Sequence, residues 1–498
     1  MNEYLPYLSQ MLAEALSGIS LIFPEIILVI AFLLVIAVDL FLPGRKSVNT
    51  FSIALAGILI SAYFSFHQNS LIERGAAIFS GNIVVDKVSV AFKLIFAFVT
   101  VLFAVFIKNN SSLKNHNKGV GDLYMLLPAV LLGLNLMAMA SNLLMIYISI
   151  EMVSIASYLM VGYIAEENKQ TEASMKYALF GSACSAIMLY GMSLLYGFTG
   201  TISLTDGSII AQLSHIAEPA TALAILLTLV GIGFKLSFFP LHFWSPDVYQ
   251  GAPTPVTAFL STAPKIAGFA VLIRFLIPFY GFKGSSGIEV FDFETALIVI
   301  AIITMIFGNF AAIWQNNIKR MLAYSSIAHT GFALMAIVAI YQNGIRSLLF
   351  YFLIYAVMNM AAFMIADRIE EQLGVSDVRK YKGLGRFFKL EIVCFVVVLV
   401  SLTGLPPTGG FIAKLFIFTS AFEKYSSSGS VWVLALLITG AVTTVVSLFY
   451  YFKIPLNAYL REAENDYKIE VRLNFMSYLI LVLTVLIVVV GLFPSILA

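Results

Sequence analysis

Two lysines stand in apolar surroundings within the segment GIGFKLSFFPLHFWSPDVYQGAPTPVTAFLSTAPK, residues 231–265. Lys235 lies five residues before Pro240, and Lys265 lies inside the next apolar run. An amine in hydrocarbon is costly unless it is paired, hydrated or neutral, so intramembrane lysines mark functional sites by default. Both lysines are therefore candidates for proton transfer.

Glu151 is the candidate partner of Lys235. It lies in LLMIYISIEMVSIASYLMVGY, with no other charge in the eight residues before it or the twelve after it. Two charges about 4 Å apart attract by about 4 kcal/mol at an effective dielectric constant of about 20. Opening such a pair would change the proton affinity of Lys235 enough to serve a proton relay. The alternative is a carboxyl that its apolar surroundings keep protonated.

Four further residues are candidates for proton transfer, and each of them also has a purely structural interpretation. Lys414 follows the segment GLPPTGG, and it shares with Lys265 the alternative of a side chain that extends to the membrane surface. His329, in SSIAHTGF, fits a relay as well as it fits a satisfied interior histidine. An interfacial aromatic belt is the alternative for His242. Tyr324 is either a relay hydroxyl or an interfacial anchor.

The other charged residues in or near apolar runs are expected to have structural roles and not a role in proton transfer. Glu172 and Lys176 are four residues apart on one predicted helix face, which favours a stabilising pair. Lys93 stands alone in its run. Glu25 lies near the end of its run and is expected to reach lipid headgroups, and Arg274 is expected to extend to the outer surface.

These residues must be positioned by helices that cross a membrane. The chain has 498 residues, of which 60% are hydrophobic and 11% charged. Soluble domains are about 45–50% apolar and about 25% charged, so the composition predicts an all-α polytopic membrane protein. Fourteen apolar runs are long enough to span a bilayer: 20–42, 50–66, 86–107, 123–140, 142–164, 173–199, 219–242, 255–280, 293–314, 320–341, 346–367, 391–421, 431–454 and 474–497.

Charge distribution predicts how the spans are oriented. With the N-terminus outside, eighteen lysines and arginines fall in inside loops and four in outside loops. This excess is the positive-inside signal, and an even number of spans then places both termini on the outer side. No loop is long enough for a separate domain. We therefore predict one membrane domain, 1–498, made of three N-terminal helices (20–107), a first repeat (123–280), a second repeat (293–454) and a C-terminal helix (474–497).

The interior of the chain is predicted to be duplicated. Glu151 precedes Lys235 by 84 residues, and His329 precedes Lys414 by 85. Spans four to eight and nine to thirteen would then be two five-helix repeats, and an odd number of helices inverts the second copy. Helix-breaking residues lie at corresponding places in spans seven and twelve, namely Pro240 and the segment 404–410. Broken helices beside buried lysines predict hydrated cavities.

Cofactor motifs are missing from the sequence. Cys184 and Cys394 are the only cysteines and do not form a CxxC pair, and no GxGxxG, GxxxxGK[ST] or HExxH string occurs. The N-terminus also lacks the basic region of a cleavable signal peptide, so the first span is expected to be kept. We expect a protein that holds no cofactor of its own.

Several of these motifs resemble a known family. The 231–265 segment, SIEMVSIASYLMVGY with EASMKYALFGSA, IKRMLAYSSIAHTGF and GLPPTGGFIAKLFIF are similar to subunit N of the proton-translocating NADH-quinone oxidoreductases, respiratory complex I. The related L and M subunits usually read LPDAH or LPDAY where this chain has SPDVYQGAPTPV, which favours subunit N. The resemblance covers about residues 20–460.

The resemblance implies a translocase subunit without a redox centre. Electron transfer from NADH to quinone would occur in partner subunits, which would hold NAD, FMN, iron–sulfur clusters and quinone. It also implies a bacterial cell inner membrane and no nucleic-acid partner. By position it implies that Glu151, Lys235, Lys265 and Lys414 form the proton relay, supported by His242, Asp247, Glu172, Lys176 and Tyr324.

Two other classes of function stay open on the sequence. The first is a subunit of a multisubunit sodium/proton antiporter of the Mrp type, which works without electron transfer. The second is a structural membrane subunit whose buried charges only fix helix packing. Two lysines beside two predicted breaks, repeated at one offset, disfavour the structural class.

Overall fold

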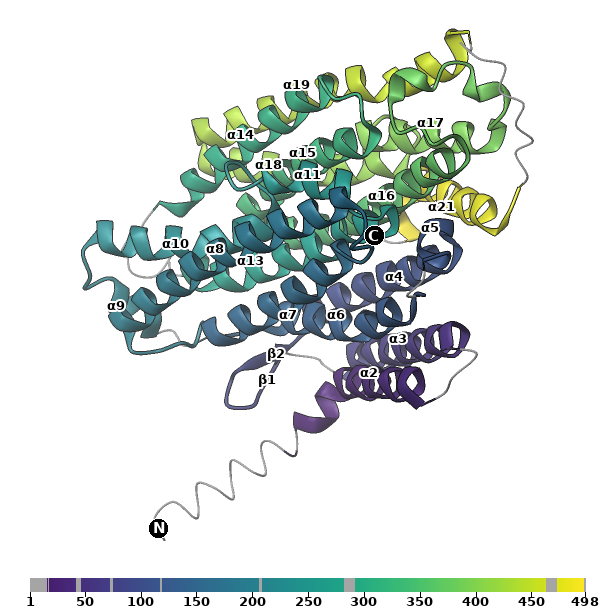
Figure 1. The fold of residues 1–498 in the computed structure, drawn as a ribbon. Coiled ribbons are helices and arrows are strands. Elements are labelled where there is room, and N and C mark those ends of the chain that lie inside the picture. Colours follow the sequence, from purple (N-terminus) through teal and green to yellow (C-terminus); the bar gives the residue numbers. More distant parts are fainter. Residues whose placement is uncertain are drawn as a thin grey trace.

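The computed structural model describes residue 16 and residues 18–41, 46–71, 75–116, 119–205, 208–281, 292–462 and 473–496. Its long helices lie side by side in one bundle (Figure 1). The helices are α2 (Phe23–Phe41), α3 (Lys46–Leu71), α4 (Lys87–Asn109), α5 (Ser111–Lys114), α6 (Gly121–Met139), α7 (Leu143–Val161), α8 (Asn168–Thr199), α9 (Ser208–Leu213), α10 (Glu218–Leu236), α11 (Trp244–Gly251), α12 (Thr254–Leu260), α13 (Ala263–Gly281), α14 (Phe293–Ile313), α15 (Ile318–Val338), α16 (Ile345–Leu373), α17 (Lys389–Thr403), α18 (Gly409–Ser428), α19 (Val431–Tyr451), α20 (Lys453–Pro455) and α21 (Phe475–Leu492).

Other regular structure is short. Strands β1 (Ala76–Ile78) and β2 (Ile83–Val85) form an antiparallel hairpin in which Ala77 pairs with Val84. Tight helical turns cover Ser20–Ile22, Ile340–Gly344, Val378–Lys380, Leu384–Arg386, Leu456–Leu460 and Pro494–Ile496. The prediction of an all-α polytopic membrane protein is confirmed.

The described residues contain thirteen helices that are long and apolar enough to cross a membrane. The predicted run 391–421 accounts for the difference from fourteen. It is divided between α17, which ends at Thr403, and α18, which begins at Gly409. α17 has only 15 residues, and α18, with 20, is not apolar enough to count as a span. The assignment of the spans to inverted repeats stays a prediction.

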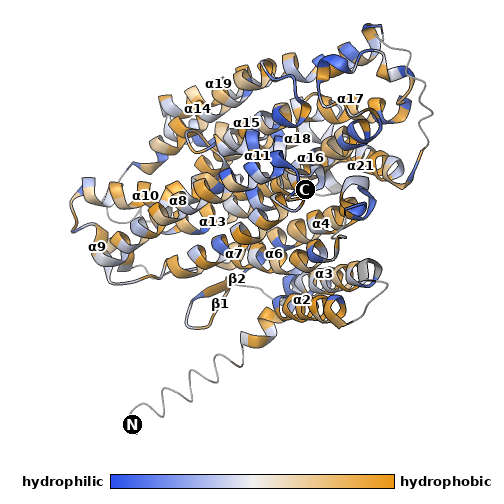
Figure 2. Cartoon of the chain, in the orientation of Figure 1, coloured by the Kyte–Doolittle hydropathy of each residue, from blue (hydrophilic) through white to orange (hydrophobic). Residues whose placement is uncertain are grey.

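Asparagine and aspartate side chains start several of these helices. Asp86, Asn142 and Asn317 each accept a hydrogen bond from a backbone N–H three residues ahead. Such caps satisfy donors that the first helical turn leaves unpaired, which matters most where lipid replaces water. Hydrophilic residues accordingly gather toward helix ends, for example around α5 and α11 (Figure 2).

The centre of the bundle is formed by α12, α13, α15 and α16. The apolar window that includes α12 and α13 is 100% buried, and those of α15 and α16 are 94% and 89% buried. In α2 and α19 the share is only 28%. Lipid can cover the apolar side chains on the outer helices. Polar groups on the central helices lie away from water and headgroups, so they need partners within the protein.

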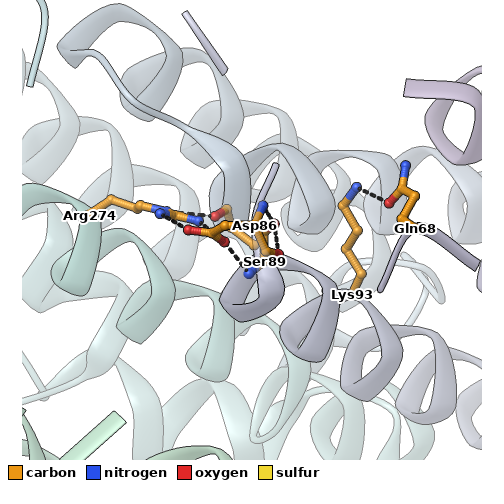
Figure 3. Close-up of polar contacts among 6 residues, drawn as sticks. Gln68, Asp86, Ser89, Lys93 and Arg274 are labelled. Carbon is orange, nitrogen blue, oxygen red and sulfur yellow. Dashed lines mark hydrogen bonds and ion pairs between the residues drawn. The ribbon is translucent and has the colours of Figure 1, made fainter. Parts of the chain in front are cut away.

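Charged side chains join α4 to neighbouring helices, contrary to the sequence prediction. Lys93 lies 2.9 Å from Glu25 Oε1 and donates to Gln68 of α3 at 3.3 Å. Arg274 forms two 2.7 Å hydrogen bonds with the carboxylate of Asp86 (Figure 3). The predictions that Glu25 reaches headgroups and that Arg274 extends to the surface were wrong, because Glu25 is 4% exposed, the Arg274 side chain is 10% exposed, and each has a partner in the protein.

Candidate functional site

Glu151 and Lys235 approach the same turn of α7 without touching. The Lys235 amine donates to Ser154 Oγ at 2.9 Å, and Glu151 lies one turn before Ser154 on α7. Glu151 Oε1 accepts a hydrogen bond from Ser185 of α8. Among the described residues no ion pair joins Glu151 to Lys235. The predicted partners therefore lie within one turn of each other along α7, and each is hydrogen-bonded to a different serine.

Lys235 is held at the end of α10 by a defined break. Ser237 has a left-handed backbone conformation with φ 57°, which ends the helix at Leu236. The Trp244 indole donates to Phe234 O at 3.0 Å, and the Thr330 hydroxyl donates to Leu236 O at 3.0 Å. Two carbonyls next to the break thus find side-chain donors in the protein, as carbonyls need where lipid surrounds the helices.

Lys265 lies in α13 and is 3% exposed. Its amine donates to Ser326 Oγ at 2.6 Å and to Ser326 O at 3.3 Å. The Tyr355 hydroxyl donates to the same Ser326 Oγ at 2.8 Å and to Ser261 O at 3.2 Å. The alternative of a side chain that extends to the surface does not apply, since the amine ends on a hydroxyl in the core.

The helix that carries Lys265 also passes close to Lys235. A Cβ added to Gly268, three residues after Lys265, would lie 3.6 Å from Lys235 Cβ and 2.9 Å from Leu236 Cδ2. A glycine at this position lets α10 and α13 approach closely. The two lysines therefore belong to adjoining helices.

His329 joins the same polar interior. Its Nδ1 lies 2.6 Å from the Tyr351 hydroxyl, and its Nε2 lies 3.4 Å from the Tyr451 hydroxyl. Tyr451 also hydrogen-bonds Ser325, and the rings of Tyr351 and Tyr355 stack with centroids 6.1 Å apart. His329 is thus satisfied by hydroxyl groups, which are also groups that pass protons.

Lys414 lies beside the second interruption. Its amine donates to Thr403 O at 2.8 Å, at the C-terminal end of α17. This end carries the partial negative charge of the helix dipole, which favours a cation. The amine also lies 4.5 Å from the centroid of the Phe332 ring. Gly404, with φ 87°, provides the left-handed turn that separates α17 from α18.

Three of the predicted supporting residues meet at one end of the bundle. Lys176 lies 2.8 Å from Glu172 and 2.9 Å from Asp247. Arg320, which sequence reasoning did not select, lies 2.6 Å from the other oxygen of Asp247. Burial raises the pKa of Asp247. The hydrogen bonds from Lys176 and Arg320, with the charges of those two residues, lower the pKa by more than burial raises it, so the pKa of Asp247 lies below its ordinary value. The cluster joins α8, α11 and α15.

His242 and Tyr324 are joined through an aromatic side chain. The His242 ring lies 4.3 Å from that of Phe307, whose centroid is 6.2 Å from that of Tyr324. His242 Nδ1 is buried without a hydrogen-bond partner in the part of the chain that the structure describes. These two residues lie near one another, but the structure gives them no hydrogen bond to the lysines.

Sequence reasoning missed the hydroxyl groups that hydrogen-bond the predicted site residues, namely Ser154, Ser185, Ser326, Tyr351 and Tyr451, and also Tyr355, which donates to Ser326. Serine and tyrosine are ordinary in apolar helices. A usable signal was their helical spacing, since Tyr351 and Tyr355 are four residues apart and share a face.

Comparison with known proteins assigns the chain to a family. Residues 140–444 match the family described as NADH:quinone oxidoreductase/Mrp antiporter, TM. NADH-quinone oxidoreductase subunit N 2 of Chloroherpeton thalassium is 41% identical over 491 residues, which cover 98% of this chain and 94% of the relative.

Two solved structures have the same fold. A chain of respiratory complex I from Thermus thermophilus is 29% identical, with a TM-score of 0.77 and coverage of 95% of this chain and 97% of that chain. A chain of the Mrp complex from Dietzia sp. is 20% identical, with a TM-score of 0.79 and coverage of 97% and 95%. The second likeness shows the fold alone. The chain belongs to the NADH:quinone oxidoreductase/Mrp antiporter membrane family, and within it to the NADH-quinone oxidoreductase subunit N group.

Proposed function

We propose that this chain is the proton-translocating membrane subunit of an NADH-quinone oxidoreductase. Relatives of this name match nearly the whole chain, and the complex I likeness covers 95% of it. In this role the chain is part of a translocase: electrons pass from NADH to quinone in other subunits, and this subunit moves protons across the membrane.

The observation that carries the proposal is that the three central lysines are buried and have no carboxylate partner among the described residues. Lys235, Lys265 and Lys414 are at most 5% exposed. Within the described residues each amine contacts hydroxyl or carbonyl oxygens, and none has a carboxylate within 4.0 Å. An ammonium without a counter-charge is costly inside a membrane, whereas a neutral amine is not. Lysines in this setting are suited to gain and lose protons.

A proton path follows from the order of these lysines. When Glu151 is close, its charge favours the ammonium form of Lys235, and movement of Glu151 away favours release of the proton. The proton would pass through water to Lys265, whose helix adjoins that of Lys235. His329 and its tyrosine partners continue the polar interior, and Lys414 is the final acceptor on the exit side.

The remaining predicted residues have a supporting role in this proposal. The cluster of Glu172, Lys176 and Asp247 fixes α8 against α11, next to the break that presents Lys235. His242 and Tyr324 both lie beside the Phe307 ring. In this proposal these five residues hold the break after α10 and the relay lysines in fixed positions relative to one another.

The chain is a multi-pass protein of the bacterial inner membrane. We propose that both termini lie on the periplasmic side, on the charge distribution of the loops; residues 1–15 and 497–498 are outside the described residues. The lipid bilayer and the other complex I subunits, especially neighbouring antiporter-like and small membrane subunits, are its partners. NAD, FMN, iron–sulfur clusters and quinone belong to those partners, and this chain is proposed to hold no cofactor.

The alternative is a subunit of an Mrp-type sodium/proton antiporter without electron transfer. The family description includes such antiporters. The Mrp structure is only 20% identical, however, so it supports a common fold and not a common activity.

Co-purification separates the two functions. The tagged chain would be extracted in mild detergent, its partners identified, and quinone reduction measured. Recovery of peripheral redox subunits with NADH-driven quinone reduction is expected. Recovery of small membrane proteins alone, with sodium-dependent proton exchange and no electron transfer, would establish the antiporter instead.

A further inference from the structure

A polar pocket of about 380 Å³ lies where several helix ends meet, on the face predicted to be cytoplasmic. The pocket is formed by the end of α4, the start of α8, α12 and α15, and the end of α16. Its lining includes Asn110, Thr254, Lys319, Asp367 and Glu370. None of the relay residues proposed above lines it.

Asp367 lies at the buried side of this pocket. It is 6% exposed, and Asn110 Nδ2 donates to both of its carboxylate oxygens at 3.1 and 3.0 Å. The nearby Lys319 pairs instead with Glu370 at 3.0 Å. In the described part of the chain Asp367 has no cation within 4.0 Å. A carboxylate held by a neutral amide is free to accept a proton, whereas one locked to a lysine is not.

One face of α16 leads from Asp367 into the core. Asp367, Phe363, Asn359 and Tyr355 follow one another at intervals of four residues, so they share a side of the helix. Tyr355 at the inner end donates to the Ser326 oxygen that also accepts from the Lys265 amine. Asp367 lies twelve positions after Tyr355, a rise of about 18 Å.

The facing helix carries a second polar stripe. Thr254, Thr257 and Ser261 are spaced three and four residues apart along α12 and its end, and Lys265 follows four residues later. The helices α12 and α16 pack together. Thr254 lines the pocket, and Tyr355 donates to the carbonyl of Ser261. Both stripes therefore begin at the pocket and end at Lys265.

Unpartnered polar groups lie between these ends. Both side-chain polar atoms of Asn359, which is 1% exposed, have no hydrogen-bond partner among the described residues. The same holds for the Tyr249 hydroxyl, on a fully buried ring that lies 6.4 Å from that of Phe363. Buried polar atoms are normally hydrogen-bonded, and ordered water satisfies those that protein groups do not.

We propose that Asp367 takes up protons from this pocket and that water held by Asn359 and Tyr249 carries them to Lys265. A proton leaves pocket water for the Asp367 carboxylate. It then passes along the water to the neutral Lys265 amine, which becomes an ammonium, and Asp367 returns to its carboxylate form. No electron moves in this step. The inference rests on the proposed function and adds the uptake route to it.

The test uses the complete complex reconstituted in vesicles, with proton translocation measured per electron transferred. Asp367→Asn keeps the shape and the contact with Asn110 but removes the proton acceptor. We expect its proton translocation to fall by roughly tenfold or more, a conservative value for loss of a proton-transfer group. Asp367→Glu should restore most of it. Glu166→Gln is the matched control, because it removes one charge from a side chain that is 74% exposed on the same face outside the pocket.

Asn359→Leu tests the water-filled section independently, with Met360→Leu as its control at a neighbouring buried position. We expect Asn359→Leu to reduce translocation and Met360→Leu not to. Assembly of every variant is checked by NADH oxidation with an artificial acceptor at the peripheral subunits. Wild-type translocation in both Asp367→Asn and Asn359→Leu, while Lys265→Ala abolishes it, would overturn the uptake route and leave the proposed function intact. Wild-type translocation in Lys265→Ala would overturn the proposed function itself.

Discussion

Replacing Lys93 with methionine should loosen α2 and α3 from the rest of the bundle. The Lys93 amine lies 2.9 Å from Glu25 Oε1, and Asn135 donates to the same oxygen at 3.1 Å. The two charged side chains are 0% and 5% exposed. Removal of the amine leaves a buried carboxylate without its counter-charge.

The expected cost follows from the burial of both partners. Removing one member of a buried ion pair costs about 3–5 kcal/mol, whereas replacing both members with apolar groups is often close to neutral. Glu25 is the third residue of α2, near the predicted membrane surface, so we expect the lower value. About 3 kcal/mol corresponds to a change of roughly a hundredfold in the equilibrium for opening of these helices.

Hydrogen exchange followed by mass spectrometry measures this opening directly. In Lys93→Met and in Glu25→Leu, amide exchange in α2 and α3 should be faster by roughly a hundredfold. In the double variant it should return to within about tenfold of wild type. Lys87→Met, at the exposed first residue of α4, is the control. Wild-type exchange in Lys93→Met, or a double variant no slower than the single ones, would refute the reasoning.

Two further predictions concern charged contacts between helices. Arg274→Lys should lower the free energy of unfolding by about 1.5 kcal/mol or more, because a lysine cannot reproduce the two hydrogen bonds to Asp86; an unchanged midpoint of thermal unfolding would count against it. Asp247→Asn should destabilise the protein at pH 7, because Lys176 and Arg320 hold the pKa of Asp247 below its ordinary value. A carboxyl with a lowered pKa stabilises the fold at pH values above the ordinary aspartate pKa of about 4, and this stabilisation is lost as the pH falls below the pKa in the folded state. The difference in unfolding free energy between Asp247→Asn and wild type should therefore disappear in acid. A gap that persists at pH 2 in thermal unfolding would contradict this origin.

Much of the fold could be predicted from the sequence because lipid imposes a simple rule. Each span needs a long apolar run, and the helices that the structure contains follow those runs closely. The predicted run 391–421 is the exception: its hydropathy is that of one span, but Gly404, in the segment of helix-breaking residues 404–410, turns the chain between α17 and α18. Apolar composition records which residues avoid water, and it does not record where the backbone bends.

The candidate site could be predicted only in part. A lysine in an apolar run is conspicuous, so Lys235 and Lys265 could be found without a structure. Their direct partners could not, because Ser154 and Ser326 lie 81 and 61 residues away in the sequence and belong to a common residue type. Lys93 and Glu25 were missed as a pair for a related reason: they lie in different apolar runs, and headgroups are an equally good partner for Glu25 near the start of α2.

Proton translocation by the assembled complex tests the central claim most directly. Lys235→Ala and Glu151→Ala would each be introduced into the complete complex, with Lys87→Met as a control, and protons moved per electron would be measured in sealed vesicles. A functional relay predicts that both variants lose most of the proton movement attributable to this subunit while the control retains it. Unchanged proton movement per electron in both variants would contradict the assignment of Lys235 and Glu151 to the relay.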